Sequence, residues 1–314
     1  MASQQQIRAS ITEQIVAALE AGGVPPWRRP WRVGPNSGFP ANVVSRKSYR
    51  GINPILLELA SERHGMSSRW WATFNQWKNL GGKVIPRPSH VPSGRWGTTI
   101  VFWTPVTKIE RDAEGDERAD RYFVMRSYTV FNVDQVEGDL LDHLRAGRAK
   151  DDTIGQVINY EPAEAAIAAT GIDIRHGGTR AFYSPSEDYV QMPPRASFSE
   201  PDEYYETILH ELVHATEHPS RLDWSRKDQE NTYALGELVA EIGACYLARE
   251  LGVPASKGLS NHVAYLGHWL KAMKNDHRFI FQASAQASRA ADYLLAFSRH
   301  EEAGADEPEA LLVG

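Results

Sequence analysis

One twelve-residue segment, residues 207–218 (TILHELVHATEH), constrains this chain more than any other. Its apolar residues favour an α-helix, and it contains His210, Glu211 and His214 in the order HExxH. On a helix, residues four positions apart lie on the same face, so both imidazoles can bind one metal ion while Glu211 lies beside it. We therefore predict His210 and His214 as metal ligands and Glu211 as the catalytic base.

A catalytic zinc site needs a third protein ligand and one open position. The apolar, helix-forming segment 232–251 contains Glu237 and Glu241, which are four residues apart. Gluzincin-type metallopeptidases complete their sites with a similar pair, in which one carboxylate binds the metal and the other holds a ligating histidine. By this similarity Glu237 is the expected ligand and Glu241 the residue behind it, although the reverse assignment stays open. Zinc is the expected metal, with manganese as the alternative.

Such a site predicts peptide hydrolysis. A bound metal ion would activate water, and Glu211 would take the proton and pass it to the leaving amine. Two short strands predicted within residues 180–193 precede the helix and have the place of the edge strand that holds an extended peptide in zincins. A protein or peptide is therefore the expected substrate, although a folded metal site without turnover agrees with the same residues. Four residues are candidates of nearly equal merit for stabilising the oxyanion, namely Tyr233, His262, Tyr265 and His268.

The net charge of -6 conceals two unlike halves. Residues 1–150 contain 21 Lys and Arg against 14 Asp and Glu, and the rest of the chain contains 13 against 26. Seven of the nine tryptophans lie within residues 1–108. Interleaved cations and aromatic rings are typical of single-stranded nucleic acid binding, because cations meet phosphates and bases stack on rings. The residues expected to contact single-stranded DNA are Arg28, Arg29, Trp31, Arg32, Arg46, Lys47, Tyr49, Arg50, Trp70, Trp71 and Lys78.

The order of predicted elements indicates an α+β protein of two domains. Helices are predicted over residues 7–21, from Asn53 and over 70–78, and strands over 98–103 and 122–133. These form a single-stranded DNA-binding domain, residues 1–140, followed by a linker, residues 141–157. A mostly helical zincin-like domain with a small sheet is expected over 158–300, with helices near 203–218, 230–251 and 258–298, the last broken near Asn275. The acidic tail, residues 301–314, is expected to be disordered.

Composition narrows the class of protein further. Cys245 is the only cysteine, which excludes disulfide scaffolds and cysteine-rich zinc modules. No apolar run approaches the roughly 20 residues that a spanning helix needs, and the first residues lack the pattern of a signal peptide. We therefore expect a cytoplasmic protein without a membrane partner.

Several segments together resemble ArdC-type antirestriction proteins of mobile elements. In order, they are PWRRPW (26–31), YRGIN (49–53), VFWTPV (101–106), YTVFNVDQVEG (128–138), FYSPSEDYVQMP (182–193), HELVHATEHPSRLD (210–223) and ELVAEIGACYL (237–247). The resemblance implies a single-stranded DNA-binding domain, shared with some plasmid primases, joined to a zincin-like metallopeptidase domain. It also implies protection of incoming DNA from restriction during conjugation. Glu217 stands where the family usually has glycine, a change expected to leave the metal ligands untouched.

Two other functions agree with the same residues. One is a metalloprotease that DNA binding localises, for cleavage of crosslinked proteins or of a repressor. The other is a DNA-coating protein whose metal is purely structural. We expect the metal to bind within residues 150–300 only and DNA to bind within residues 1–140 only.

Overall fold

The N-terminal helices begin and end at residues whose local chemistry favours a helix boundary. The computed structural model describes residues 3–22, 24–28, 36–111, 117–145, 160–224, 232–256 and 260–303. Helix α1 (Gln4–Glu20) starts with a reciprocal capping box between Ser3 and Gln6. Helix α2 (Asn53–His64) has a proline in its first turn and ends at Gly65, whose φ of 66° is left-handed and favours glycine. Both helices lie where the sequence predicts them.

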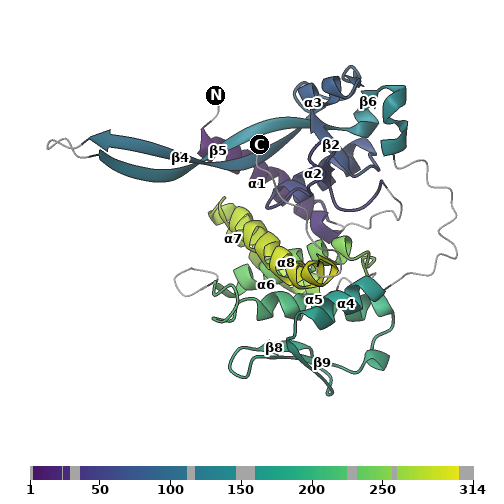
Figure 1. Cartoon of the computed structure of the whole chain (residues 1–314), viewed down its shortest axis with the longest axis vertical. Coiled ribbons are helices and arrows are strands. Elements are labelled where there is room, and N and C mark those ends of the chain that lie inside the picture. The colour runs from purple at the N-terminus through teal and green to yellow at the C-terminus, as the bar shows by residue number, and fades with distance from the viewer. Residues whose placement is uncertain are drawn as a thin grey trace.

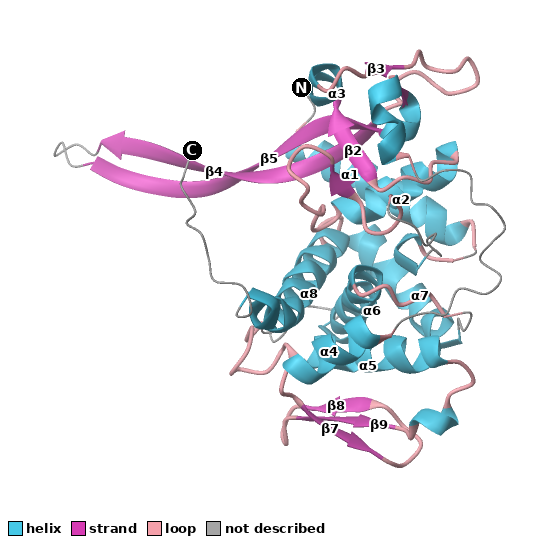
Figure 2. Ribbon diagram, turned by 45° about the vertical axis from the view of Figure 1, so that its right-hand side comes forward, coloured by secondary structure: helices cyan, strands magenta, loops and turns pink. Residues whose placement is uncertain are grey.

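A four-stranded sheet forms the centre of the N-terminal domain and extends into a long hairpin (Figures 1 and 2). The strand order is β1 (Ala41–Asn42), β2 (Trp70–Thr73), β5 (Glu117–Asn132) and β4 (Thr98–Arg111), and only β1 and β2 pair in parallel. The hairpin of β4 and β5 confirms the two predicted strands and is longer at its tip than predicted. A separate two-stranded sheet pairs β3 (Lys83–Val84) with β6 (Val136–Glu137).

The helix predicted over residues 70–78 is wrong in its first half. Trp70–Thr73 form strand β2, and helix α3 (Phe74–Asn79) begins only after them, at a capping box between Thr73 and Gln76. Aromatic residues suit a pleated, half-buried strand, and Trp71 packs into the core against α2. Pairing with β5 therefore decides the conformation of a segment whose local pattern also fits a helix.

The N-terminal domain continues beyond residue 140, where the linker was expected to begin. Residues Asp139–Leu144 form a 3₁₀ helix, and Leu141 and Leu144 are buried with Trp77 in a small apolar cluster. The linker prediction is therefore wrong for residues 141–145, and residues 146–157 lie outside the described part of the chain. Likewise, the last helix runs to Ala303, three residues into the expected tail, and residues 304–314 are not described.

The C-terminal domain is mostly helical with a small sheet, as predicted. It consists of α4 (Glu161–Ala169), β7 (Asp173–His176), β8 (Phe182–Ser184), β9 (Tyr189–Met192), α5 (Pro201–Ala215), α6 (Thr232–Glu250), α7 (Ser260–Asn275) and α8 (Phe279–Ala303). Strand β9 is central, parallel to β7 and antiparallel to β8, so β8 is an edge strand. The predicted break near Asn275 is confirmed, because α7 ends there. Strand β7 was not predicted.

The two domains share one continuous apolar core. One buried cluster contains residues of both domains. From the N-terminal domain it includes Ile15 of α1, Ile55 of α2 and Trp27, which lies between these helices in the sequence. From the C-terminal domain it includes Leu238 of α6 and Trp269 of α7. The edge of the Trp27 indole packs against the ring of Trp269, with ring centroids 6.2 Å apart. Figure 1 shows α1 and α2 lying against the bundle of α6, α7 and α8. This shared packing disfavours independent folding of the two halves, whereas the expected division of metal and DNA binding between them stays a prediction. Among the described helices, none has both the length and the apolar character needed to cross a bilayer.

Candidate metal centre

Helices α5 and α6 pack closely enough to bring three metal-binding side chains together. A Cβ atom added to Gly243 of α6 would lie 2.9 Å from Val213 Cγ2 of α5, so a larger residue would force the helices apart. The Nε2 atoms of His210 and His214 lie 3.7 and 3.6 Å from the carboxylate oxygens of Glu237. The glycine thus allows a carboxylate on one helix to face two imidazoles on the other.

The donor set fits a divalent metal ion. One nitrogen or oxygen atom from each of His210, His214 and Glu237 lies within 4.8 Å of the other two. Ligands of a tetrahedral zinc ion, at about 2.0 to 2.1 Å from it, are separated by about 3.3 Å, close to the distances observed here. Of the two glutamates that the sequence left open, Glu237 is the one in this cluster.

Carboxylates set the charge of this centre. Burial lowers the pKa of His210, but the hydrogen bond to Glu237 and the charges of Glu211 and Glu241 outweigh burial, so its pKa is raised above the ordinary value. The same negative charges that favour an imidazolium ion favour a metal cation at the same position.

A large cavity surrounds the three residues. Its volume is about 850 Å³, and Glu211, which is nearly buried, lines it together with the three ligand candidates. Phe182 and Tyr183 of the edge strand β8 form another part of its wall. Among the described strands, β8 has a neighbour on only one side, so its outer edge suits pairing with an extended peptide.

A glutamate that was not predicted as part of the site supports His214. Glu217 Oε1 lies 3.0 Å from Nδ1 of His214, the ring nitrogen opposite the one that faces Glu237. Such a contact fixes the tautomer and orientation of a ligating imidazole. The expectation that Glu217 leaves the ligands untouched is therefore wrong, whereas the support of a ligating histidine by Glu241 stays a prediction. The spacing of three residues from His214 is the signal that could have identified Glu217.

Glu241 faces an arginine from the N-terminal domain. Nη1 of Arg28 lies 3.6 Å from Glu241, and its Nη2 lies 2.7 Å from Glu206 and 3.3 Å from Ser256. Arg28 is buried and lines the cavity. The prediction of Arg28 as a DNA contact is therefore wrong, because its guanidinium is enclosed among carboxylates. No local pattern could have revealed this, since Glu206 is 178 residues away along the chain.

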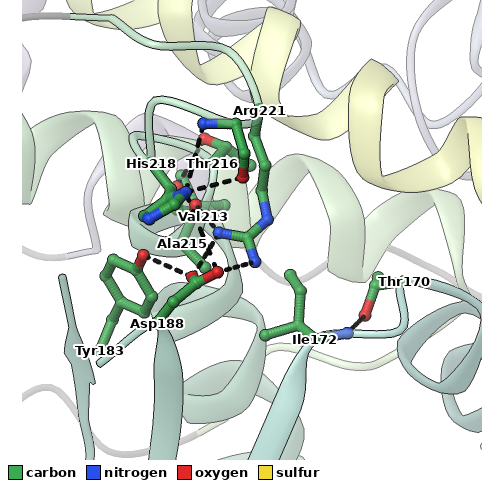
Figure 3. Close-up of polar contacts among 10 residues, drawn as sticks. Thr170, Ile172, Tyr183, Asp188, Val213, Ala215, Thr216, His218 and Arg221 are labelled. Atoms are coloured by element: carbon green, nitrogen blue, oxygen red, sulfur yellow. Dashed lines mark hydrogen bonds and ion pairs between the residues drawn. The ribbon is translucent and has the colours of Figure 1, made fainter. Parts of the chain in front are cut away.

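A second group of charges ties the small sheet to the end of α5 (Figure 3). Arg221 donates to both carboxylate oxygens of Asp188 at 2.7 and 3.1 Å and to the backbone oxygen of Ala215 at 2.9 Å. Tyr183 of β8 donates to the same carboxylate at 2.8 Å. These bonds hold the cavity wall in position relative to the HExxH helix. His218 bonds to Ser220 and lies beyond the end of α5.

Two tyrosines line the cavity near Glu237. The hydroxyl groups of Tyr233 and Tyr265 are 2.9 Å apart. The hydrogen bond to Tyr265 and burial raise the pKa of Tyr233 well above its ordinary value, and Glu237 adds to the effect. Tyr233 therefore stays protonated at neutral pH and can donate a hydrogen bond. Of the other oxyanion candidates, His268 is exposed, and the side chain of His262 is not described.

Three more of the predicted DNA contacts are buried or paired within the protein. Tyr49 and Trp71 belong to the core, and burial raises the pKa of Tyr49. Arg50 forms ion pairs with Asp292 at 2.8 Å and with Glu250 at 3.4 Å. The predictions for Tyr49 and Trp71 are wrong, because aromatic residues serve in cores as well as on surfaces. The side chain of Arg50 is 34% exposed, so its contact with DNA stays a prediction.

The other predicted DNA contacts are exposed or lie outside the described residues. Arg46, Lys47 and Lys78 are exposed, and Trp70 is half-buried. The guanidinium carbons of Arg46 and Arg69 lie 4.6 and 5.2 Å from the centroid of Trp70, so two cations lie against this ring. Arg29, Trp31 and Arg32 belong to the part of the chain that is not described.

Two families match the chain in succession. The family described as the N-terminal domain of anti-restriction factor ArdC matches residues 5–131. A family described as zincin-like metallopeptidase matches residues 161–286. The first match covers the sheet and its helices, and the second covers the HExxH helix and Glu237.

Relatives extend the similarity over almost the whole chain. The uncharacterized protein y4eC of Sinorhizobium fredii is 35% identical and is matched over 90% of each chain. Two DNA primases TraC of Escherichia coli are 36% and 34% identical over 93% of this chain, which spans only 27% and 20% of their lengths.

Solved structures agree with the sequence relatives. Antirestriction protein ArdC from the R388 plasmid in its metal-free form is 37% identical, has a TM-score of 0.74, and is matched over 93% of this chain and 98% of that one. Its Mn(II)-bound form is 36% identical, has a TM-score of 0.70, and is matched over 93% and 97%. With both domains matched in order, the chain belongs to the ArdC family of antirestriction proteins.

Proposed function

We propose that the chain binds single-stranded DNA through its N-terminal domain, holds a divalent metal ion in a metallopeptidase site, and protects the transferred DNA of a mobile element. One observation carries the proposal: ligand atoms of His210, His214 and Glu237 converge within 4.8 Å beside Glu211 in a cavity bordered by an edge strand. Relatives named as an antirestriction protein and as DNA primases support the DNA part. Zinc is the expected metal, and the Mn(II)-bound relative makes manganese the alternative.

Each residue of the site has a separate role in the proposed hydrolysis of a peptide. A divalent metal ion, when bound, lowers the pKa of water and polarises a carbonyl group. An extended peptide pairs with the outer edge of β8, which holds its carbonyl group near the two histidines. Glu211 takes a proton from the attacking water molecule and delivers it to the leaving nitrogen. Glu217 holds the imidazole of His214 by the contact at its Nδ1 atom.

Tyr233 and Tyr265 are the best donors for the oxyanion. Both residues line the cavity, and Tyr233, whose pKa is raised, remains protonated at neutral pH. Preorganised donors aimed at a developing negative charge lower the barrier most when water is excluded. Loss of kcat in Tyr233→Phe or Tyr265→Phe, with the metal content unchanged, is the result that supports this role.

The DNA part of the proposal relies on exposed cations of the N-terminal domain. Arg46, Lys47 and Lys78 remain on the surface, and two arginines lie close to the ring of Trp70. Residues 1–108 contain 14 Lys and Arg against 4 Asp and Glu, which suits a polyanionic partner. Binding of labelled oligonucleotides at increasing salt tests it. Single strands should bind more tightly than duplexes with a clear salt dependence, and salt-insensitive or absent binding refutes the proposal.

A DNA-localised peptidase is the second candidate function, and the cavity and the free edge of β8 favour it. Glu211→Gln distinguishes the two candidate functions, because it removes the proton acceptor and leaves the three metal ligands in place. Glu203→Gln, which changes another carboxylate in the same cavity, is the matched control. If Glu211→Gln keeps its metal and still protects DNA from restriction, hydrolysis is dispensable for protection. If protection is lost together with peptide cleavage, the peptidase carries the function.

A further inference from the structure

We propose that the bases of single-stranded DNA stack on one face of the β4–β5 hairpin, formed by Phe102, Arg126 and Tyr128 and called here the arm face. The inference rests on the single-stranded DNA binding proposed above and adds a surface that the sequence analysis did not identify. Composition gave no signal for it, because Arg126 and Tyr128 lie outside the tryptophan-rich segments. The alternation of exposed aromatic residues along the strands is the pattern that could have indicated it.

The strand register brings the three residues to one side of the hairpin. Phe102 of β4 lies directly opposite Arg126 of β5, and Ile100 lies opposite Tyr128. Because side chains alternate between the faces of a strand, Phe102, Arg126 and Tyr128 share one face, and Tyr128 is the diagonal neighbour of Phe102. The two rings meet edge to face, with centroids 5.7 Å apart and an angle of 73° between their planes.

The arm face starts where the hairpin leaves the body of the protein. Ile100, on the same face, is 2% exposed under α2, whereas Phe102 and Tyr128 are 45% and 42% exposed. Figure 1 shows the hairpin extending well beyond the helices that cover its base. Two large rings on an otherwise open ribbon offer flat apolar surface to a ligand.

The charge of the β4–β5 hairpin fits a nucleic acid. Across residues 98–107 and 123–132, Arg126 is the only charged side chain. It is the cross-strand partner of Phe102 and lies two residues from Tyr128 on the same strand, so a phosphate bound to Arg126 leaves the adjoining bases beside the rings. A cation set among stacking platforms is the arrangement that binds single strands without regard to sequence, because every base has a π-face.

The edge of β4 disfavours another protein strand as the occupant. The side chain of Asn53 already bonds to both the N–H and the carbonyl of Val101, at 2.9 Å each. Pro105, farther along the same strand, has no N–H to donate. Addition of a peptide strand along this edge would therefore lack regular hydrogen bonds, whereas stacking on the face needs none.

A cross-strand aromatic pair also stabilises an isolated ribbon, so the test has to separate stability from binding. Phe123 provides the matched control, because it is 65% exposed on the same hairpin and faces the other side, opposite Pro105. Phe102→Leu and Tyr128→Leu keep apolar cross-strand contact while removing the ring planes. Tyr128→Phe keeps the ring and should keep the affinity. Circular dichroism and thermal unfolding verify that each variant is folded.

The measurement is fluorescence anisotropy of a labelled oligothymidylate, and of the same oligonucleotide with abasic positions, against the full-length protein. Stacking predicts that Phe102→Leu and Tyr128→Leu each weaken oligothymidylate binding roughly 5- to 150-fold, with less effect on the abasic strand. Their salt dependence should stay that of the parent. Arg126→Gln should instead reduce the slope of log affinity against log salt by about 0.7.

The outcomes distinguish this inference from the function on which it rests. If the parent protein does not bind single strands at all, the proposed function fails. If the parent binds while the two leucine variants bind equally well, the arm face is not the platform and only this inference fails. An equal loss in Phe123→Leu overturns it as well, since the effect would then not be specific to one face.

Discussion

Substitution of Arg28 by methionine tests whether a side chain of the N-terminal domain is structurally required inside the metallopeptidase cavity. Methionine keeps most of the apolar stem and removes the guanidinium that faces Glu206 and Glu241. The side chain of Glu241 is only 5% exposed, whereas that of Glu206 is 18% exposed and keeps its bonds to Ser256. The loss of the guanidinium should therefore destabilise mainly the charged form of Glu241. We expect the variant to remain folded and to lose a large part of its stability at neutral pH.

The size of the loss follows from the chemistry of a buried carboxylate. Removing one partner of a buried ion pair costs about 3–5 kcal/mol. Glu241 can limit this cost by taking up a proton, and protonating a glutamate of ordinary pKa, about 4.3, costs about 3.7 kcal/mol at pH 7. At pH 5 the same protonation costs only about 1 kcal/mol. The folded pKa of Glu241 is raised in the variant, so the deficit grows as the pH rises.

Urea unfolding of the parent and of Arg28→Met at pH 5 and pH 7 measures the deficit. The double variant Arg28→Met, Glu241→Gln is the control, because it removes the charge that has lost its counterion, and it should recover most of the loss at pH 7. A deficit that is equal at the two pH values, or a double variant as unstable as the single one, would refute the reasoning.

Three further predictions concern the metal, the cavity wall and the shared core. Glu217→Gln should lower metal affinity about 10- to 100-fold, because it releases His214, and Glu237→Ala should lower the affinity further. Competition with a chelator measures both affinities. An unchanged affinity in Glu217→Gln would contradict the role assigned to Glu217. Arg221 and Tyr183 hold the pKa of Asp188 below its ordinary value of 3.8, so Asp188→Asn should be less stable than the parent at neutral pH. Because that stabilisation is lost as the pH falls through the lowered pKa, the difference should vanish in acid, and a constant difference contradicts it. Residues 160–303 expressed alone should aggregate or unfold with low cooperativity, since α1 and α2 cover part of their core; a sharp, reversible thermal transition would contradict this expectation.

The part of the site that lies within one helix could be predicted from the sequence. His210, Glu211 and His214 follow the helical period, so their common location beside one cavity needs no tertiary information. The break at Asn275 and the β4–β5 hairpin also follow local patterns. These elements are correct because the local preference and the tertiary packing agree.

The remaining features depend on contacts between distant segments. Tyr49 and Trp71 have the composition of a stacking surface but are buried, and only the packing of α2 on the sheet decides this. Arg28 lies in a basic, aromatic segment whose pattern indicates a nucleic-acid contact, yet its partners are on α5 and α6. Strand Trp70–Thr73 was predicted as helix because its pairing with β5 is not encoded in its own residues.

The continuous core also predicts which part of such a chain recombination can transfer to another protein. A recombination event that joined only one half to another protein would expose the apolar faces of both α1 and α6 to water. The unit of genetic exchange should therefore be the pair of domains together. The TraC primases fit this expectation, because the region that matches 93% of this chain makes up 27% and 20% of their lengths.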